Sequence, residues 1–205
     1  SHLFSFSNNQ IWKIFSHISF ALAKLHSVNY MHLDVSPSNI LQCKQDSEDI
    51  FKLTDFGTAL AFGTFDEGDE GAGPYVSPEA LAYPDSEFEV GAPTDIFSFG
   101  TVLLELVTKK LAPRAEDNYQ KFRNGNYNFA NYDIPAEFTF IKDMLHFNPN
   151  QRPTAEHLLS MPRVQEELQH LRTKIAKTPS KPHTAHQATT PPTTTSRLPP
   201  ETPYT

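Results

Sequence analysis

The sequence has 205 residues, with 17 basic and 24 acidic side chains and a formal net charge of -7 at pH 7. This length suffices for one globular domain with a core, and the acidic balance argues against a general nucleic-acid binder, which presents a clustered basic face. The one cysteine excludes an intramolecular disulfide framework and a cysteine-based zinc site, and no apolar run approaches the roughly 18 residues of a membrane span.

The first part of the chain shows a helical pattern followed by loops and short strands. Apolar residues at three- and four-residue spacing predict an amphipathic helix over 9–27. A proline and polar residues predict a loop over 30–39, and two β-like segments at 40–43 and 50–53 predict a small hairpin. Residues 57–78 carry an acidic run and no periodicity, so we expect a long exposed loop, a type of segment that often carries function.

The pattern from residue 94 onward is mainly helical. Residues 94–108 are apolar on most sides, which predicts a helix buried in the middle of the domain. Further helices are predicted at 119–123, 136–145, 155–159 and 168–177. Thr154 is the expected N-cap of the helix at 155–159. Because the sequence begins with Ser1 rather than Met, we expect it to be a piece of a longer protein.

The last 33 residues differ in composition from the rest, with seven prolines, ten threonines and one acidic residue. Such a sequence cannot bury a core, which predicts a domain over 1–172 and a disordered Thr/Pro-rich tail over 173–205. Three threonines of this tail, Thr178, Thr190 and Thr202, each precede a proline, as do the sites of proline-directed kinases. They are candidate phosphosites, although Thr-Pro pairs also arise from this composition alone.

The polar residues of the loops form a series whose order and spacing are more informative than any member. The series is His32-Leu33-Asp34, Asn39, Asp55-Phe56-Gly57, Ser77-Pro78-Glu79, Asp95 and Arg152. Each short string has a high chance-match rate, but the probability that five occur in register over about 120 residues by chance is very small. The series resembles the C-terminal lobe of a eukaryotic protein kinase.

This resemblance implies a protein-kinase-like fold: a mainly α-helical C-lobe with a small β-hairpin, an N-lobe missing from this chain and a disordered C-terminal tail. It also implies ATP and Mg²⁺ as cofactors. Asp34 would be the catalytic residue that orients the substrate hydroxyl and accepts its proton. Asn39 and Asp55 would hold Mg²⁺ and, with Ser36, would form the cofactor-binding set. Structural support would come from His32, Phe56, Gly57, Glu79, Asp95 and Arg152.

The resemblance gives these supporting residues separate roles. His32 would shape the catalytic loop by packing and hydrogen bonding. Asp95, at the start of the buried helix, would accept hydrogen bonds from the backbone of that loop. Glu79 and Arg152 would form the buried ion pair that fastens the end of the activation segment to the lobe.

Two positions differ from ordinary Ser/Thr kinases, since Ser36 stands in place of a lysine and Ala72 in place of the threonine that pairs with it. Other strings resemble the Wee family: Pro37-Ser38-Asn39-Ile40, Glu67-Gly68-Asp69, Asp95-Ile96-Phe97-Ser98 and Phe122-Arg123-Asn124-Gly125. This resemblance implies transfer of phosphate to a tyrosine of a cyclin-dependent kinase, which restrains mitotic entry, in the nucleus or cytoplasm. It implies a protein substrate as partner. The charge and the lack of a long apolar run lead us to expect no nucleic-acid partner and no membrane segment in this chain.

Two other interpretations stay open: a pseudokinase that acts as a scaffold, and an ordinary Ser/Thr cell-cycle kinase with an altered loop. The presence of Asp34, Asn39 and Asp55 together favours activity, because a decayed site is expected to lose one of them. The sequence contains neither a glycine-rich phosphate loop nor a strand lysine ahead of the helix at 9–27. We therefore expect that these residues alone do not hold ATP productively.

Overall fold

The computed structural model describes residues 6–177 apart from 46–47, 70, 72, 115 and 127. Its helices and strands in chain order are α1 Asn8–His26, β1 Tyr30–Met31, β2 Ile40–Gln45, β3 Glu48–Leu53, β4 Leu60–Ala61, α2 Pro78–Leu81, α3 Ala92–Thr108, α4 Glu116–Arg123, α5 Ile141–Met144, α6 Ala155–Ser160 and α7 Pro162–Lys177. The fold is mainly helical with small sheets. The predicted disordered tail begins at residue 173, and its part from 178 onward, with Thr178, Thr190 and Thr202, lies outside the described residues.

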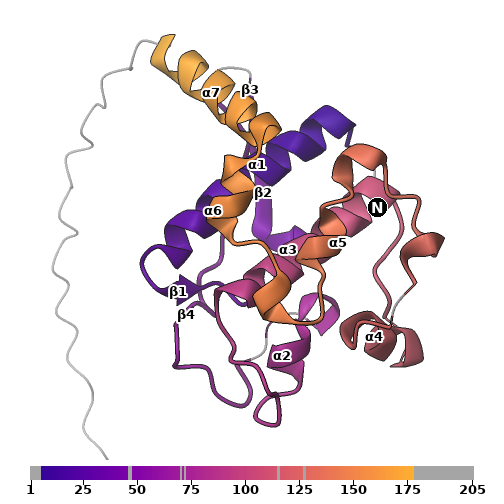
Figure 1. Ribbon diagram of the computed structural model, residues 1–205. Helices are drawn as coiled ribbons and strands as arrows, with labels where there is room; N and C mark the ends of the chain where they lie inside the picture. The colour runs from indigo at the N-terminus through magenta and orange to yellow at the C-terminus, as the bar shows by residue number, and fades with distance from the viewer. Residues whose placement is uncertain are drawn as a thin grey trace, which may run out of the picture.

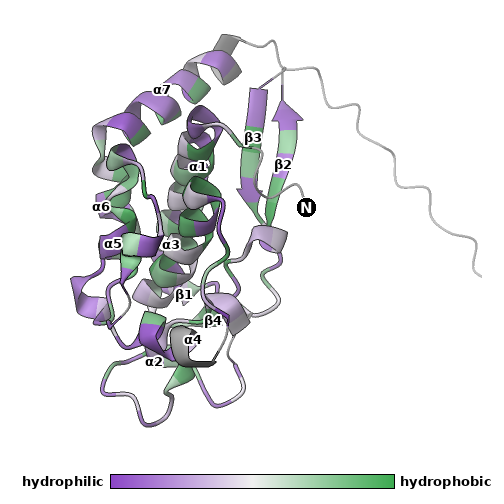
Figure 2. Cartoon of the chain, turned by 90° about the vertical axis from the view of Figure 1, so that its right-hand side faces the viewer, coloured by the Kyte–Doolittle hydropathy of each residue, from purple (hydrophilic) through white to green (hydrophobic). Residues whose placement is uncertain are grey.

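Helix α3 forms the centre of the domain, and α1, α5 and the segment before α6 pack around it (Figure 1). The sequence explains this position, because residues 96–106 are mainly apolar on all sides of the helix. In the structure all of them are buried. Helix α1 buries one face through Ile11, Phe15 and Ile18, and it also contacts α6 and α7. Hydrophobic residues of α1 and α3 meet in the interior (Figure 2). None of the described helices is long and apolar enough to cross a membrane.

Both ends of α1 and the start of α6 follow local sequence signals. Ser7 and Gln10 form a capping box at the first turn of α1, and the last turn carries the basic residues Lys24 and His26. The side chain of Thr154 accepts a hydrogen bond from the backbone of the first turn of α6, as the sequence predicts. Helix α7 continues to Lys177 and thus runs through the predicted domain boundary at residue 172, which stays a prediction.

The predicted hairpin is present and longer than expected, since β2 and β3 pair antiparallel from Ile40 opposite Leu53 to Gln45 opposite Glu48. A second sheet was not predicted. In it β1 pairs antiparallel with β4 inside segments that the sequence predicts to be loops. Each of these strands has two residues, too few to show an alternating pattern. That a second lobe is missing from the chain stays a prediction.

The helix predicted over 136–145 was wrong, because the chain forms a 3₁₀ turn at Ala136–Phe138 and then the short α5. Aromatic packing explains the break. Phe138 stacks on Trp12 at 5.1 Å between ring centroids, and Phe140 lies 4.7 Å from Phe15. In one continuous helix, residues two apart point to nearly opposite sides and could not both reach α1.

His17 of α1 makes the stability of the fold depend on pH. Burial lowers the pKa of its imidazole from 6.5 to about 4. Between these values the unfolded chain binds the proton and the folded chain does not, so the free energy of unfolding falls as pH falls. The loss from pH 7 to pH 4 should be at most about 3 kcal/mol.

Urea unfolding of wild type and His17→Gln at pH 7, 6, 5 and 4.5 measures this contribution. The free energy of unfolding should change less steeply with pH in His17→Gln than in wild type. His157→Gln, at an exposed position, should keep the wild-type slope. Equal slopes in wild type and His17→Gln would show that His17 is not the group that titrates.

Candidate active site

The loop between β1 and β2 is fixed by a buried carboxylate, that of Asp95 in the first turn of α3. Asp95 Oδ2 accepts a hydrogen bond from the backbone N–H of His32 at 2.8 Å, and Oδ1 accepts one from Leu33 at 2.9 Å. The imidazole Nε2 of His26 lies 2.8 Å from Asp95 Oδ2. The side chain of Asp95 is fully buried. The loop therefore holds a fixed position against the core helix.

The same carboxylate maintains a strained backbone. Leu33 has φ of 65°, in the left-handed region that a bulky side chain rarely adopts. Such a conformation costs on the order of 1–3 kcal/mol and persists where the surroundings determine it. Here the two hydrogen bonds to Asp95 determine it, and the following residue is Asp34.

Asp34 is held by an amide that comes from the end of the same loop. Asn39 Nδ2 donates to Asp34 Oδ2 at 2.7 Å and to its backbone oxygen at 2.8 Å. Asn39 is buried and Asp34 is half-buried. One donor group thus sets the rotamer of the carboxylate and closes the loop around it.

Asp55 is brought to this place by the pairing of β2 with β3. The backbone N–H of Thr54 donates to Asn39 O at 2.9 Å, and Asp55 follows directly with φ of 59°. Asp55 is exposed, and its Oδ1 accepts a hydrogen bond from Gly57 N at 3.3 Å. The turn therefore presents an exposed carboxylate directly after the backbone contact with Asn39.

The side-chain oxygens of Asn39 and Asp55 fit as ligands of a magnesium ion that is shared with a bound phosphate. Mg²⁺ prefers oxygen ligands and is held by one or two carboxylates together with substrate phosphates rather than by a full protein cage. Asn39 and Asp55 offer an amide oxygen and a carboxylate. Within the described part of the chain, no group of three or more His, Cys, Asp or Glu residues could hold a metal by itself.

His32 and Phe56 support the two loops that carry these residues. The buried imidazole of His32 lies 3.0 Å from Thr54 O through Nε2, and its ring packs edge-on against Phe56 at 5.0 Å. Thr58 Oγ1 donates to His32 O at 2.9 Å. Phe56 itself is 52% exposed, so a large part of this apolar residue lies at the surface.

Ser36 presents no charge to the site. It is buried, and its hydroxyl lies 2.8 Å from that of Ser38. The structure therefore places this predicted cofactor-binding residue within the loop's own hydrogen bonding. Ala72, its expected counterpart, lies outside the described residues.

The end of the long loop is tied down by the ion pair of Glu79 and Arg152. Two parallel contacts join them, Nη1 to Oε1 at 2.7 Å and Nη2 to Oε2 at 2.8 Å, and both side chains are at most 1% exposed. Thr94 Oγ1 also donates to Glu79 Oε1 at 2.9 Å. The remaining donors of Arg152 reach the carbonyl oxygens of Pro93, His146 and Phe147. The pair is thus dry and fully hydrogen-bonded.

A second buried carboxylate, Glu105 of α3, holds the same loop and was missed in the sequence. Tyr75 Oη donates to Glu105 Oε2 at 2.9 Å, while Ala112 N and Arg114 Nη2 reach Oε1 at 2.9 and 3.2 Å. Burial, together with the Glu105 carboxylate, raises the pKa of Tyr75. The signal was an acidic residue within an otherwise apolar helical run, which requires buried partners.

Arg123 of α4 is a further anchor that sequence reasoning missed. Its Nε donates to Val76 O at 2.8 Å and its Nη2 to Pro74 O at 2.9 Å. The guanidinium lies 3.6 Å from the ring centroid of Tyr119. Burial lowers its pKa to about 10. The end of the loop is therefore held by hydrogen bonds to Glu105 of α3 and Arg123 of α4.

Gly71 is the point where the long loop touches the loop that carries Asp34. A Cβ added at Gly71 would lie 1.8 Å from Leu33 O and 3.3 Å from the Cα of Asp34. Only glycine allows this approach, because the nearest atom is backbone. A Cβ at Gly73 would meet no atom within 4 Å, so the constraint is specific to residue 71.

Comparison with known proteins relates this geometry to an activity class. The family model described as protein kinase domain matches residues 1–164. The "Mitosis inhibitor protein kinase mik1" of Schizosaccharomyces pombe is 29% identical over 75% of this chain and 28% of its own length. A "Membrane-associated tyrosine- and threonine-specific cdc2-inhibitory kinase" of Drosophila melanogaster is 33% identical over 76% of this chain and 29% of its own. A "Calcium and calcium/calmodulin-dependent serine/threonine-protein kinase" of Lilium longiflorum is 28% identical over 77% of this chain and 31% of its own length. The chain thus spans less than a third of each relative.

Proposed function

Because this chain belongs to the protein kinase family, we propose that it forms the substrate-binding lobe of an enzyme that transfers the γ-phosphate of ATP to a protein hydroxyl. The observation that carries the proposal is the convergence of Asp34, Asn39 and Asp55 at one edge of the lobe. Their side chains provide one positioned carboxylate and two oxygen ligands, the groups that phosphoryl transfer requires of a protein.

Each of the three residues has a role that follows from its contacts. The amide of Asn39 fixes the carboxylate of Asp34, which orients the attacking hydroxyl and takes its proton. The oxygens of Asn39 and Asp55 would hold magnesium. When bound, Mg-ATP supplies the phosphoryl group and neutralises its charge. The ATP-clamping lobe would come from residues outside this chain, and the location, nucleus or cytoplasm, is part of the proposal.

The substrate we propose is a tyrosine of a cyclin-dependent kinase. The support is the likeness to relatives whose names describe mitosis inhibition and cdc2-inhibitory tyrosine and threonine specificity. The strings that resemble the Wee family agree with this assignment. The likeness to the lily Ser/Thr kinase keeps Ser/Thr specificity as an alternative.

Ser36 favours a second candidate, a pseudokinase that acts as a scaffold. An ordinary kinase has a lysine here, next to the transferring phosphate, whereas this chain buries a neutral hydroxyl bonded to Ser38. The proposed kinase would therefore stabilise the transferred phosphate through magnesium and the proposed ATP-clamping lobe.

Phosphoamino-acid analysis separates the candidates. The protein expressed from its full reading frame is incubated with Mg-ATP and a catalytically dead cyclin-dependent kinase bound to its cyclin. Phosphotyrosine on this substrate supports the proposal, and phosphoserine or phosphothreonine alone supports the Ser/Thr alternative. Absence of phosphate on any protein, with purified enzyme that melts cooperatively, supports the scaffold.

Gly71→Ala should impair protein-substrate turnover by at least about tenfold, because the new Cβ pushes the loop off Leu33 and displaces groups around Asp34. The steady-state kcat/KM for the protein substrate measures this effect, with the KM for ATP expected to stay within about twofold. Gly73→Ala is the matched control and should behave as wild type, since its Cβ has open space. Equal losses in both variants, or none in Gly71→Ala, would contradict the assigned contact.

A further inference from the structure

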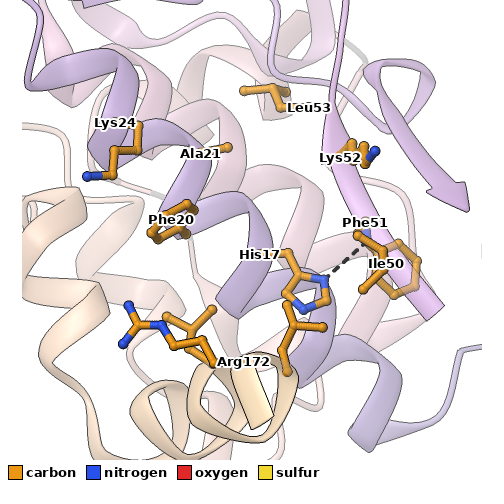
Figure 3. Close-up of a pocket in the computed structure, with 11 residues that line it drawn as sticks. His17, Phe20, Ala21, Lys24, Ile50, Phe51, Lys52, Leu53 and Arg172 are labelled. Atoms are coloured by element: carbon orange, nitrogen blue, oxygen red, sulfur yellow. Dashed lines mark hydrogen bonds between the residues drawn. The ribbon is translucent and has the colours of Figure 1, made fainter. Parts of the chain in front are cut away.

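A cavity of about 530 Å³ lies between α1, β3 and α7, away from the residues of the candidate active site (Figure 3). Its walls are almost wholly apolar, formed by Phe20, Ala21, Ile50, Phe51, Leu53, Leu168 and Leu171. Such a volume lies within the range of small-molecule sites in proteins, roughly 300–1,000 Å³. The cavity is therefore large enough to take a ligand.

One wall of the cavity holds a buried hydrogen-bond donor for which the described part of the chain offers no acceptor. The backbone N–H of Phe51 donates to His17 Nδ1 at 3.1 Å, so Nδ1 is the accepting nitrogen and the ring proton sits on Nε2. His17 is 7% exposed, and its Nε2 is buried without a partner among the described residues. Figure 3 shows this second nitrogen turned away from β3. A buried donor of this kind costs about 1–3 kcal/mol unless a ligand accepts from it.

The rim of the cavity is basic, although the whole chain is acidic. Lys24, Lys52 and Arg172 line it, and no acidic residue that the structure describes does so. None of the three forms an ion pair with any residue that the structure describes. By contrast, the nearby Glu48 is already bound by Lys13 and Lys174. The rim therefore carries uncompensated positive charge around an apolar interior.

We propose that this cavity binds a small amphipathic anion whose apolar body lies between α1, β3 and α7 and whose carboxylate accepts a hydrogen bond from His17 Nε2, while Lys24, Lys52 and Arg172 at the rim attract its negative charge. Charge complementarity distinguishes this occupant from the chain's own C-terminal segment. The segment beyond α7, residues 178–205, carries two basic side chains and one acidic, so it lacks the negative charge that the rim attracts. A free fatty acid and an aromatic carboxylate share the required chemistry.

Isothermal titration calorimetry of the full-length protein tests the proposal with decanoate and 2-naphthoate as probes of the two shapes. At least one should bind with 1:1 stoichiometry, and its affinity should fall as the KCl concentration is raised. Decyltrimethylammonium, with the opposite charge, should not bind. Failure of both anions to bind, or equal affinity for the cation, would overturn the proposal.

Rim variants test the role of charge without disturbing the core. Lys52→Met and Arg172→Met should each weaken binding about two- to fivefold, as expected for exposed ion pairs, whereas Lys142→Met, at an exposed position of α5, should leave it unchanged. Ala21→Phe should fill the cavity and weaken binding at least about tenfold, while the melting temperature reports whether the variant folds. Affinity that none of the three cavity variants changes would place the ligand elsewhere.

Discussion

Replacing Asp34 by asparagine should lower the rate of phosphotransfer by ~10²–10⁴, the usual contribution of a positioned general base. The variant is close to isosteric, and its amide oxygen can still accept from Asn39 Nδ2, so the loop is expected to stay in place. The loss therefore reports the missing proton acceptor rather than a displaced loop. The measurement is kcat for the full-length enzyme with Mg-ATP and its protein substrate.

Two controls define the result. The affinity for Mg-ATP should stay within about twofold of wild type, because Asp34 is not among the proposed magnesium ligands. Asp143→Asn, at an exposed position of α5, should keep wild-type kcat. A kcat for Asp34→Asn within twofold of wild type would refute the role assigned to this carboxylate.

Removing one partner of the Glu79–Arg152 pair should destabilise the lobe, and the two partners should not be equivalent. Arg152→Met leaves the Glu79 carboxylate buried with only Thr94 and also removes donors from three carbonyl groups. We expect a loss of about 3–5 kcal/mol in the free energy of unfolding. Glu79→Gln keeps those three contacts of Arg152 and should cost less, about 1.5–3 kcal/mol.

Urea unfolding of the three proteins gives these values, with Arg163→Met as the control. Arg163 forms an exposed pair with Glu166 at 3.4 Å, which should be worth no more than about 1 kcal/mol. An Arg152→Met variant as stable as Arg163→Met, or an order in which Glu79→Gln is the more destabilised, would contradict this description of the pair.

Elements with strong local signals were predictable from the sequence. The helix of α1 follows from apolar spacing and its capping box, and the β2–β3 hairpin follows from two short β-like runs around a polar connection. The predicted helix over 136–145 failed because Phe138 and Phe140 both pack against α1, a contact at long sequence separation. The β1–β4 pairing likewise depends on partners about 30 residues apart and has no local pattern.

The polar residues of the site were predictable as a spaced series, but the contacts that position them were less so. Asp34, Asn39, Asp55 and Asp95 occur at family spacing, and the structure joins the first two directly, links Asn39 to the residue before Asp55, and uses buried Asp95 to hold the loop that carries Asp34. The approach of Gly71 to Leu33 gave no sequence signal beyond the glycine itself, because it is a backbone contact between distant loops.

The most direct test of the proposed function is the amount and position of phosphate that the full-length protein transfers to a catalytically dead cyclin-dependent kinase, measured by mass spectrometry with and without EDTA. If Asp34, Asn39 and Asp55 form a magnesium-dependent phosphotransfer site, the substrate should gain phosphate on tyrosine with Mg-ATP and none when EDTA removes the metal. A substrate that stays unphosphorylated with Mg-ATP, or one that gains the same phosphate in EDTA, would contradict the assignment.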